Sequence, residues 1–167
     1  KVLEHLLLDK NNGASVLNNI TRARENARAV QDHITKEVWQ CLNDYYHLIR
    51  DKQIQGQVKA GDPVTAMDSL IYHGMLYHGT VDITMARGEG FTYLNIGKFL
   101  ERAILSCDML HIKLTELNYN VHQPVEVPAL RYLLYSLSGN ELYLKTHRCT
   151  FQVEPVLHQI LYNDNFP

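Results

Sequence analysis

The chain has 167 residues, of which 46 % are hydrophobic and 20 % are charged, and its formal net charge is −2. These values are typical of a folded globular chain and exclude a disordered segment, a collagen-like repeat and a coiled-coil rod. The absence of a basic block argues against nucleic-acid binding, and the longest apolar runs are too short to span a membrane. The cysteines, an odd number spread widely through the chain, favour a reducing compartment, so we expect a cytoplasmic protein.

Helical periodicity predicts the elements in chain order, beginning with a helix in the first residues. From Val16 to Ile49, apolar residues recur every three or four positions on an arc of about 100°. This pattern predicts a long helix over 15–49 with Ser15 as its N-cap, and it leaves open a break near Thr35, which would cap a second segment. Residues 50–62 are polar and contain two glycines, so we expect a loop there.

The pair Asp62 and Pro63 predicts the start of the next helix, because aspartate accepts an orphan backbone N–H and proline has none to satisfy. We expect that helix to end near Gly79. Further helices are predicted over 88–117, 127–138, 141–148 and 155–162, with a loop over 118–126. No segment alternates as a strand does, so the predicted fold class is all-α, an antiparallel helical bundle of about six helices with two long central ones.

Two pairs of segments suggest an internal repeat. Residues 20–27 resemble residues 96–103, and residues 6–11 resemble residues 160–165. The second offset is about twice the first, which is typical of a unit that recurs along the chain. Chance similarity between amphipathic helices is the alternative interpretation.

Charged side chains form a stripe on the first predicted long helix, at spacings of three and four residues: Arg22, Glu25, Arg28, Asp32 and Lys36. A solvated face would have the same pattern. The second long helix is apolar on almost every side, so we expect Glu101 and Asp108 to be partly buried and to need cationic partners such as Arg22, Arg28 or Arg87. The pattern therefore predicts either a Glu–Arg network that holds the helices in register or a polar pocket for a charged ligand.

The segment Arg-Ala-Arg-Glu-Asn-Ala-Arg-Ala-Val (22–30) and the segment Thr-Met-Ala-Arg-Gly-Glu-Gly-Phe (84–91), which runs into Leu-Glu-Arg-Ala (100–103), resemble the alpha-E family. This is a bacterial, all-helical family of unknown biochemical function, and the resemblance covers essentially the whole chain. It implies a polar centre of Glu25, Arg28, Glu101 and Arg102, with Arg87 and Glu89 as second candidates. Family members are about twice as long and open with another Glu-Arg helix, so we expect this chain to be a fragment that lacks it.

Two residues depart from the family pattern, since Phe91 stands where the family usually has Trp and Lys98 where it usually has Arg. Lysine cannot offer a carboxylate the bidentate fork of arginine, so a rigid pair between Lys98 and Glu101 is not expected.

The resemblance also implies a biochemical neighbourhood. Members of the family are encoded beside, or fused to, ATP-grasp-like peptide ligases and transglutaminase-like peptidases. We therefore expect an accessory or binding domain of a peptide-synthesis or peptide-modification system, with those enzymes and a peptide as partners. The alternatives are a helical enzyme that uses clustered carboxylates, by acid–base or metal-assisted chemistry, and a structural oligomerisation module.

A metal site is the remaining possibility raised by the sequence. Asp44 with His47, and Asp108 with His111, have the three-residue spacing of di-iron ligands. Nothing in the sequence places the further inward-facing carboxylates that such a site requires, so we expect no metal and no cofactor.

Overall fold

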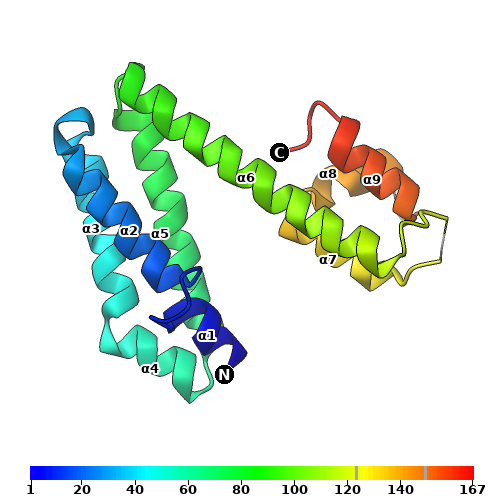
Figure 1. Cartoon of the computed structure of the whole chain (residues 1–167), viewed down its shortest axis with the longest axis horizontal. Coiled ribbons are helices and arrows are strands. Elements are labelled where there is room, and N and C mark those ends of the chain that lie inside the picture. The colour runs from blue at the N-terminus through cyan, green and yellow to red at the C-terminus, as the bar shows by residue number, and fades with distance from the viewer. Residues whose placement is uncertain (123, 149) are drawn as a thin grey trace. The chain divides into compact units, whose positions relative to one another are not determined.

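A computed structural model describes residues 1–122, 124–148 and 150–167, with the side chain of residue 60 left out. These residues form nine α-helices and no strand (Figure 1), which confirms the all-α class, whereas the sequence predicted about six helices. The chain divides into two compact units, Lys1–Asn95 and Ile96–Pro167. The family resemblance over the whole chain predicts a single domain of residues 1–167, and this assignment stays a prediction. No helix in the described part combines the length and hydropathy needed to cross a membrane.

The first unit contains five complete helices, a short 3-10 turn and the start of α6. Its elements are α1 (Val2–Leu8), α2 (Val16–Ala29), η1 (Gln31–His33), α3 (Lys36–Arg50), α4 (Lys52–Ala60), α5 (Pro63–Thr84) and the first residues of α6 (Glu89–Glu116). Helix α3 packs against both α2 and α5, and α1 and α4 lie at one end of these three helices (Figure 1). Apolar side chains of α1, α2, α3, α4 and α5 form the main core of this unit.

The predicted long helix over 15–49 is two helices, and the break near Thr35 is confirmed. Ser15 Oγ accepts a hydrogen bond from the Asn18 N–H at 3.3 Å, and Thr35 Oγ1 accepts one from the Val38 N–H at 3.3 Å. The Thr35 hydroxyl also lies 2.8 Å from the Thr84 hydroxyl, which links the start of α3 to the end of α5. Each hydroxyl satisfies a backbone donor that a helix N-terminus leaves free, so the chain begins a new helix at each position.

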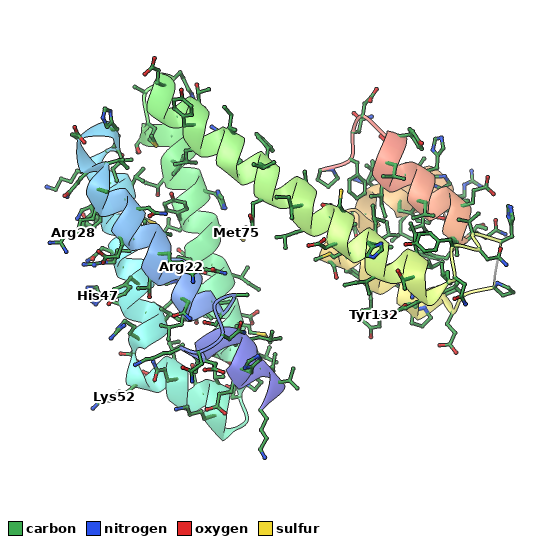
Figure 2. All side chains as sticks on the ribbon, viewed as in Figure 1. Arg22, Arg28, His47, Lys52, Met75 and Tyr132 are labelled. Atoms are coloured by element: carbon green, nitrogen blue, oxygen red, sulfur yellow. The ribbon has the colours of Figure 1, made fainter. Side chains whose placement is uncertain are left out.

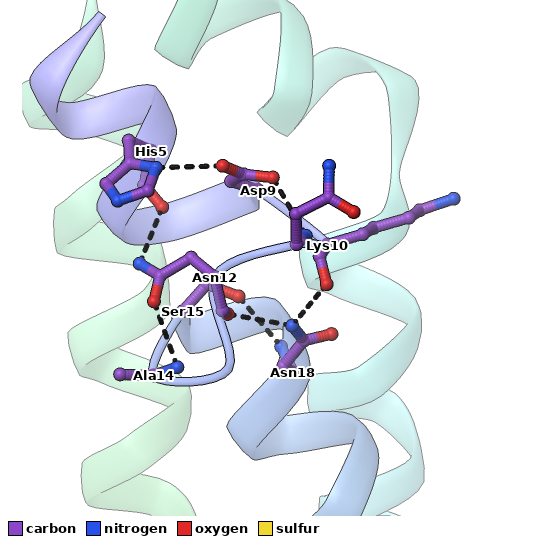
Figure 3. Close-up of polar contacts among 8 residues, drawn as sticks. His5, Asp9, Lys10, Asn12, Ala14, Ser15 and Asn18 are labelled. Atoms are coloured by element: carbon purple, nitrogen blue, oxygen red, sulfur yellow. Dashed lines mark hydrogen bonds and ion pairs between the residues drawn. The ribbon is translucent and has the colours of Figure 1, made fainter.

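The turn between α1 and α2 is held by side chains that bond to the backbone (Figure 3). The Asn18 amide donates to the carbonyl oxygens of Lys10 and Asn12 at 2.9 and 2.8 Å, and the Asn12 amide donates to the His5 carbonyl at 3.1 Å. His5 Nδ1 lies 2.8 Å from Asp9 Oδ2. These contacts satisfy the backbone groups of a connection that has no regular structure of its own.

The predicted loop over 50–62 is wrong, because most of it forms α4. Ile54 and Val58 are one helical turn apart and both are buried. Asp51 caps the helix by accepting from the Gln53 N–H at 2.6 Å, and Gly61 ends it at a φ of 104°, a left-handed conformation that costs glycine little. Two buried apolar side chains at this spacing pack a short, otherwise polar helix against the core.

Helix α5 begins at Pro63 as predicted, with the Asp62 carboxylate accepting from the Thr65 N–H at 3.4 Å. The predicted end near Gly79 is wrong, because the helix continues to Thr84. A glycine inside a helix costs about 1 kcal/mol relative to alanine. Burial of Val81, which packs with Val38 and Met85 in a small second core, offsets that cost.

The second unit contains the rest of α6 with α7 (Val127–Ser136), α8 (Asn140–His147) and α9 (Val153–Tyr162), close to the predicted helices. Gln123, in the predicted loop over 118–126, and Cys149 lie outside the described residues. The core of the unit packs around Leu130, Leu134 and Tyr143. The ring of Tyr143 is fully buried, and its hydroxyl donates to the Thr150 carbonyl at 2.8 Å.

At the end of α7, the residue with the left-handed conformation is Ser138, and the glycine, Gly139, follows it. Ser138 has a φ of 59°, in the left-handed region that usually selects glycine. The Gly139 N–H then donates to the Leu134 carbonyl at 2.8 Å, which closes the helix end. The glycine follows the serine because the ring of Phe166 occupies the space that a Cβ on Gly139 would need.

Candidate functional site

A pocket of about 620 Å³ opens in the first unit between α2, α5 and the first turns of α6, and we call it the Glu89 pocket. Ala23, Ala27 and Val30 line one side, at spacings of four and three residues that place them on one face of α2 and its C-cap. Leu94 and the buried Val38 add apolar surface. The volume falls in the range of about 300–1,000 Å³ that is typical of sites for small ligands.

Few polar groups reach this pocket, and they come from different elements: Asn26, His33, Tyr77, Glu89 and Tyr93. Glu89 is exposed in the first turn of α6, where the helix dipole favours a carboxylate. Burial raises the pKa of Tyr77, and the nearby Cys41 thiol group raises this pKa further, so the phenol stays protonated and can donate a hydrogen bond. Apolar walls with a few separated polar groups are typical of a site that binds a small ligand.

The pocket exists because small residues, Ala23, Ala27 and Gly90, line it. The side chains of Ala23 and Ala27 leave the space above α2 empty. A Cβ built on Gly90 would lie 3.1 Å from the His33 carbonyl oxygen, so the first turn of α6 lies directly on the backbone of η1. A larger residue at any of these three positions would narrow the pocket or push its walls apart.

Of the predicted site residues, only Glu89 lines this pocket. Glu25 lies on α2 and pairs with Arg24, its neighbour in sequence, at 3.0 Å. Arg24 Nε also donates to Asn43 Oδ1 at 2.8 Å, and its guanidinium lies 4.6 Å from the centre of the Tyr46 ring. The arginine that joins α2 to α3 is therefore Arg24.

Arg24 was missing from the predicted site, although the sequence carried a signal for it. Leu17 and Ile20, which are both buried, precede it at spacings of three and four residues, so Arg24 lies on the buried face of α2. An arginine on such a face needs partners, which the aromatic rings and the amide oxygen of α3 provide.

The predicted charged stripe does not continue past Arg28 to Asp32 and Lys36, because α2 ends at Ala29. Arg28 is exposed and extends outward from α2 (Figure 2), and Arg22 is exposed as well. Asp32 lies in η1, where its carboxylate is 3.7 Å from His33 Nε2, and Lys36 begins α3.

Arg87, a second candidate from the family resemblance, holds the turn between α5 and α6. Its guanidinium donates to the Asp82 carbonyl oxygen at 2.7 Å and lies 4.1 Å from the centre of the Phe91 ring. Both partners are near in sequence, so the contacts stabilise the local turn.

Glu101, Arg102 and Asp108 lie in the second unit and are exposed, so the predicted partial burial of the two carboxylates is wrong. Helix α6 buries Leu110, near its C-terminal end, against the core of this unit, and its more central apolar residues remain exposed. None of the ion pairs among the described residues includes these three side chains. The polar centre of Glu25, Arg28, Glu101 and Arg102 combines residues of both units and stays a prediction.

The part of the chain that the structure describes contains no group of three or more His, Cys, Asp and Glu side chains placed to hold a metal ion. His111, of the predicted Asp108 and His111 pair, has its Nδ1 atom 3.1 Å from the Tyr119 hydroxyl. Asp44 and Asp108, the carboxylates of the two predicted pairs, are both exposed.

Comparison with known families gives a match over the full chain. The model of the Alpha-E family, which is described as a predicted alpha-helical domain with a conserved ER motif, matches residues 1–167. The sequence contains one Glu-Arg dipeptide, Glu101–Arg102. No curated protein and no solved structure matches the chain.

Proposed function

Because the chain belongs to the Alpha-E family, we propose that it is an accessory binding domain of a peptide-synthesis or peptide-modification system. Its partners in this proposal are ATP-grasp-like and transglutaminase-like enzymes, the classes that the family resemblance implies. The Glu89 pocket is the observation that carries the binding role, because it combines a suitable volume, apolar walls and few polar groups.

The lining of the pocket favours a peptide segment as the ligand. Ala23, Ala27 and Val30 offer an apolar surface for an aliphatic or aromatic side chain. The exposed Glu89 carboxylate offers an acceptor for a neighbouring cation, either a basic side chain or a free amino group. The best ligand is therefore an apolar residue next to a positive charge.

Two tryptophan substitutions on α2 test this proposal. Ala23 and Ala29 are both exposed, but only Ala23 lines the pocket. Ala23→Trp fills the pocket, whereas Ala29→Trp makes the same change on another face of the helix. Because each costs about 0.5 kcal/mol in helix propensity, we expect similar melting temperatures.

Binding is measured by biolayer interferometry against the purified ATP-grasp-like and transglutaminase-like proteins of the same genome. We expect the native chain and Ala29→Trp to bind one of them equally, and Ala23→Trp to bind at least an order of magnitude more weakly. The proposal is refuted if neither enzyme binds the native chain. It is also refuted if Ala23→Trp binds like the native chain.

A further inference from the structure

The outer face of α5 is apolar and uncovered within the first unit. Six large apolar residues of this helix are exposed: Val64, Ile71, Tyr72, Met75, Leu76 and Ile83. At 100° per residue they fall on an arc of about 140°. Met75 projects from α5 on the side away from α2 (Figure 2). Isolated exposed apolar residues are ordinary, but a run of them along one helix face marks an interaction surface.

A groove of about 550 Å³ runs beside this face, between α5 and α3, and we call it the α3–α5 groove. Met75, Leu76 and Ile83 line it from α5, and Cys41 lines it from α3. Gly79 leaves a gap in the α5 wall, since a Cβ there would meet no atom within 4 Å. The spacing of Met75, Gly79 and Ile83, one turn apart each time, gives the groove the periodicity of a helix.

The charges along the α3–α5 groove are all negative. Glu37 and Asp44 line it from α3 and are exposed. They are seven residues apart, which places both on one face of α3 with an axial separation of about 10.5 Å. Neither belongs to an ion pair among the described residues. No Lys or Arg lines the groove, and α5 contains none between Pro63 and Thr84.

We propose that the α3–α5 groove binds an amphipathic helix of a partner protein, with an apolar stripe flanked by Lys or Arg two turns apart. The apolar stripe would lie on Met75, Gly79 and Ile83, as in other helix-in-groove complexes. The cations would lie near Glu37 and Asp44, where complementary charge speeds association and selects the partner. A second copy of the chain fits less well, because it would bring the same acidic rims together. This inference is independent of the Glu89 pocket and goes beyond the proposed function.

Two synthetic helical peptides test the proposal by isothermal titration calorimetry with the full chain. Both have leucines at helical spacing and no tryptophan, and they differ only in carrying lysines or glutamates beside the leucines. We expect the lysine peptide to bind at least an order of magnitude more tightly than the glutamate peptide. We also expect its affinity to fall in about 0.5 M NaCl, where screening shortens the Debye length to about 4 Å. Equal binding of the two peptides would overturn the charge assignment.

Substitutions locate the peptide on the protein. Gly79→Leu fills the gap in the groove wall and improves helix propensity, so the chain should fold and lose most of its affinity for the lysine peptide. Gly56→Leu, in α4, is the matched control, because a Cβ at Gly56 also meets no atom within 4 Å and Gly56 does not line the groove. Unchanged affinity of Gly79→Leu would place the peptide elsewhere and overturn the proposal.

A pair of neutralising substitutions tests the acidic rim. Glu37→Gln combined with Asp44→Asn should weaken binding of the lysine peptide roughly two- to thirtyfold, the range expected for two exposed ion pairs. Glu116→Gln combined with Asp164→Asn changes the net charge equally at residues that do not line the groove, and it should leave the affinity unchanged. Sedimentation at several concentrations completes the test, since a dimer that Gly79→Leu abolishes would make a second copy the occupant and overturn the proposal.

Discussion

Adding one methyl group to Gly79 or to Gly90 should change the stability of the first unit in opposite directions. Both glycines lie in helices, Gly79 inside α5 and Gly90 in the first turn of α6. A Cβ at Gly79 meets no atom within 4 Å, whereas a Cβ at Gly90 would lie 3.1 Å from the His33 carbonyl oxygen. The two alanine variants therefore compare the same chemical change in open and in occupied space.

The expected magnitudes follow from these surroundings. Gly79→Ala should raise the free energy of unfolding by about 0.5–1 kcal/mol, the helix-propensity difference between glycine and alanine. At Gly90 the methyl group is closer to a backbone oxygen than the usual separation of about 3.3–3.6 Å. The backbone of η1 must shift, and overpacking of this kind costs about 1–3 kcal/mol, more than the helix-propensity gain of about 0.5–1 kcal/mol that alanine also brings here. Gly90→Ala should therefore be less stable than the native chain.

Urea unfolding followed by the fluorescence of Trp39 measures this difference. Trp39 is the only tryptophan of the chain and lies in α3, so its signal reports on the first unit. The midpoint should rise for Gly79→Ala and fall for Gly90→Ala, with an unchanged slope for both variants. A Gly90→Ala variant as stable as Gly79→Ala would show that the backbone of η1 moves aside at no cost in free energy. The close approach of Gly90 to the His33 carbonyl oxygen would then not define the Glu89 pocket.

Three further substitutions test individual contacts. Tyr143→Phe should lower the free energy of unfolding by about 1 kcal/mol, since it removes the donor to a carbonyl oxygen, and thermal circular dichroism measures the loss. Ser138→Gly should stabilise the second unit by about 1 kcal/mol in the same assay, because glycine tolerates the φ of 59°. The pKa of Asp9 is lowered mainly because its carboxylate accepts a hydrogen bond from the Asn11 backbone N–H. The ionised carboxylate therefore stabilises the fold above the pKa that Asp9 has in the unfolded chain, and this stabilisation is lost as the pH falls through the lower pKa of the folded chain. Urea titrations of Asp9→Asn should then show a weaker loss of stability in acid than the native chain shows.

Local chemistry made the helix boundaries predictable at several positions. Ser15, Thr35 and Asp62 each cap a helix by accepting a backbone N–H, and this role depends on the residue and its nearest neighbours alone. The missed helix α4 shows the limit of that reasoning. Its sequence is polar, and the burial of Ile54 and Val58 comes from packing against distant parts of the chain.

The candidate site was less predictable, because its walls depend on how elements meet. Glu89 was identified through the family resemblance. Ala23 and Ala27 fall on the predicted apolar arc, where they would be expected to face the core, yet they line an open pocket. Ala23 is exposed and Ala27 is half-buried, and α2 ends close by at Ala29. Spacing along a helix does not show where a neighbouring helix stops.

The position of Met75 makes the α3–α5 groove sensitive to oxidants. Its exposure is 69 %, the highest among the four methionines, whereas Met85 is buried at 6 %. Peroxide should therefore convert Met75 to its sulfoxide first, which replaces a flexible apolar side chain by a polar one. A sulfoxide on this wall would interrupt the apolar surface without unfolding the helix beneath it. The chain would keep its fold and its core while losing the chemical character of one face, and a methionine sulfoxide reductase would restore it.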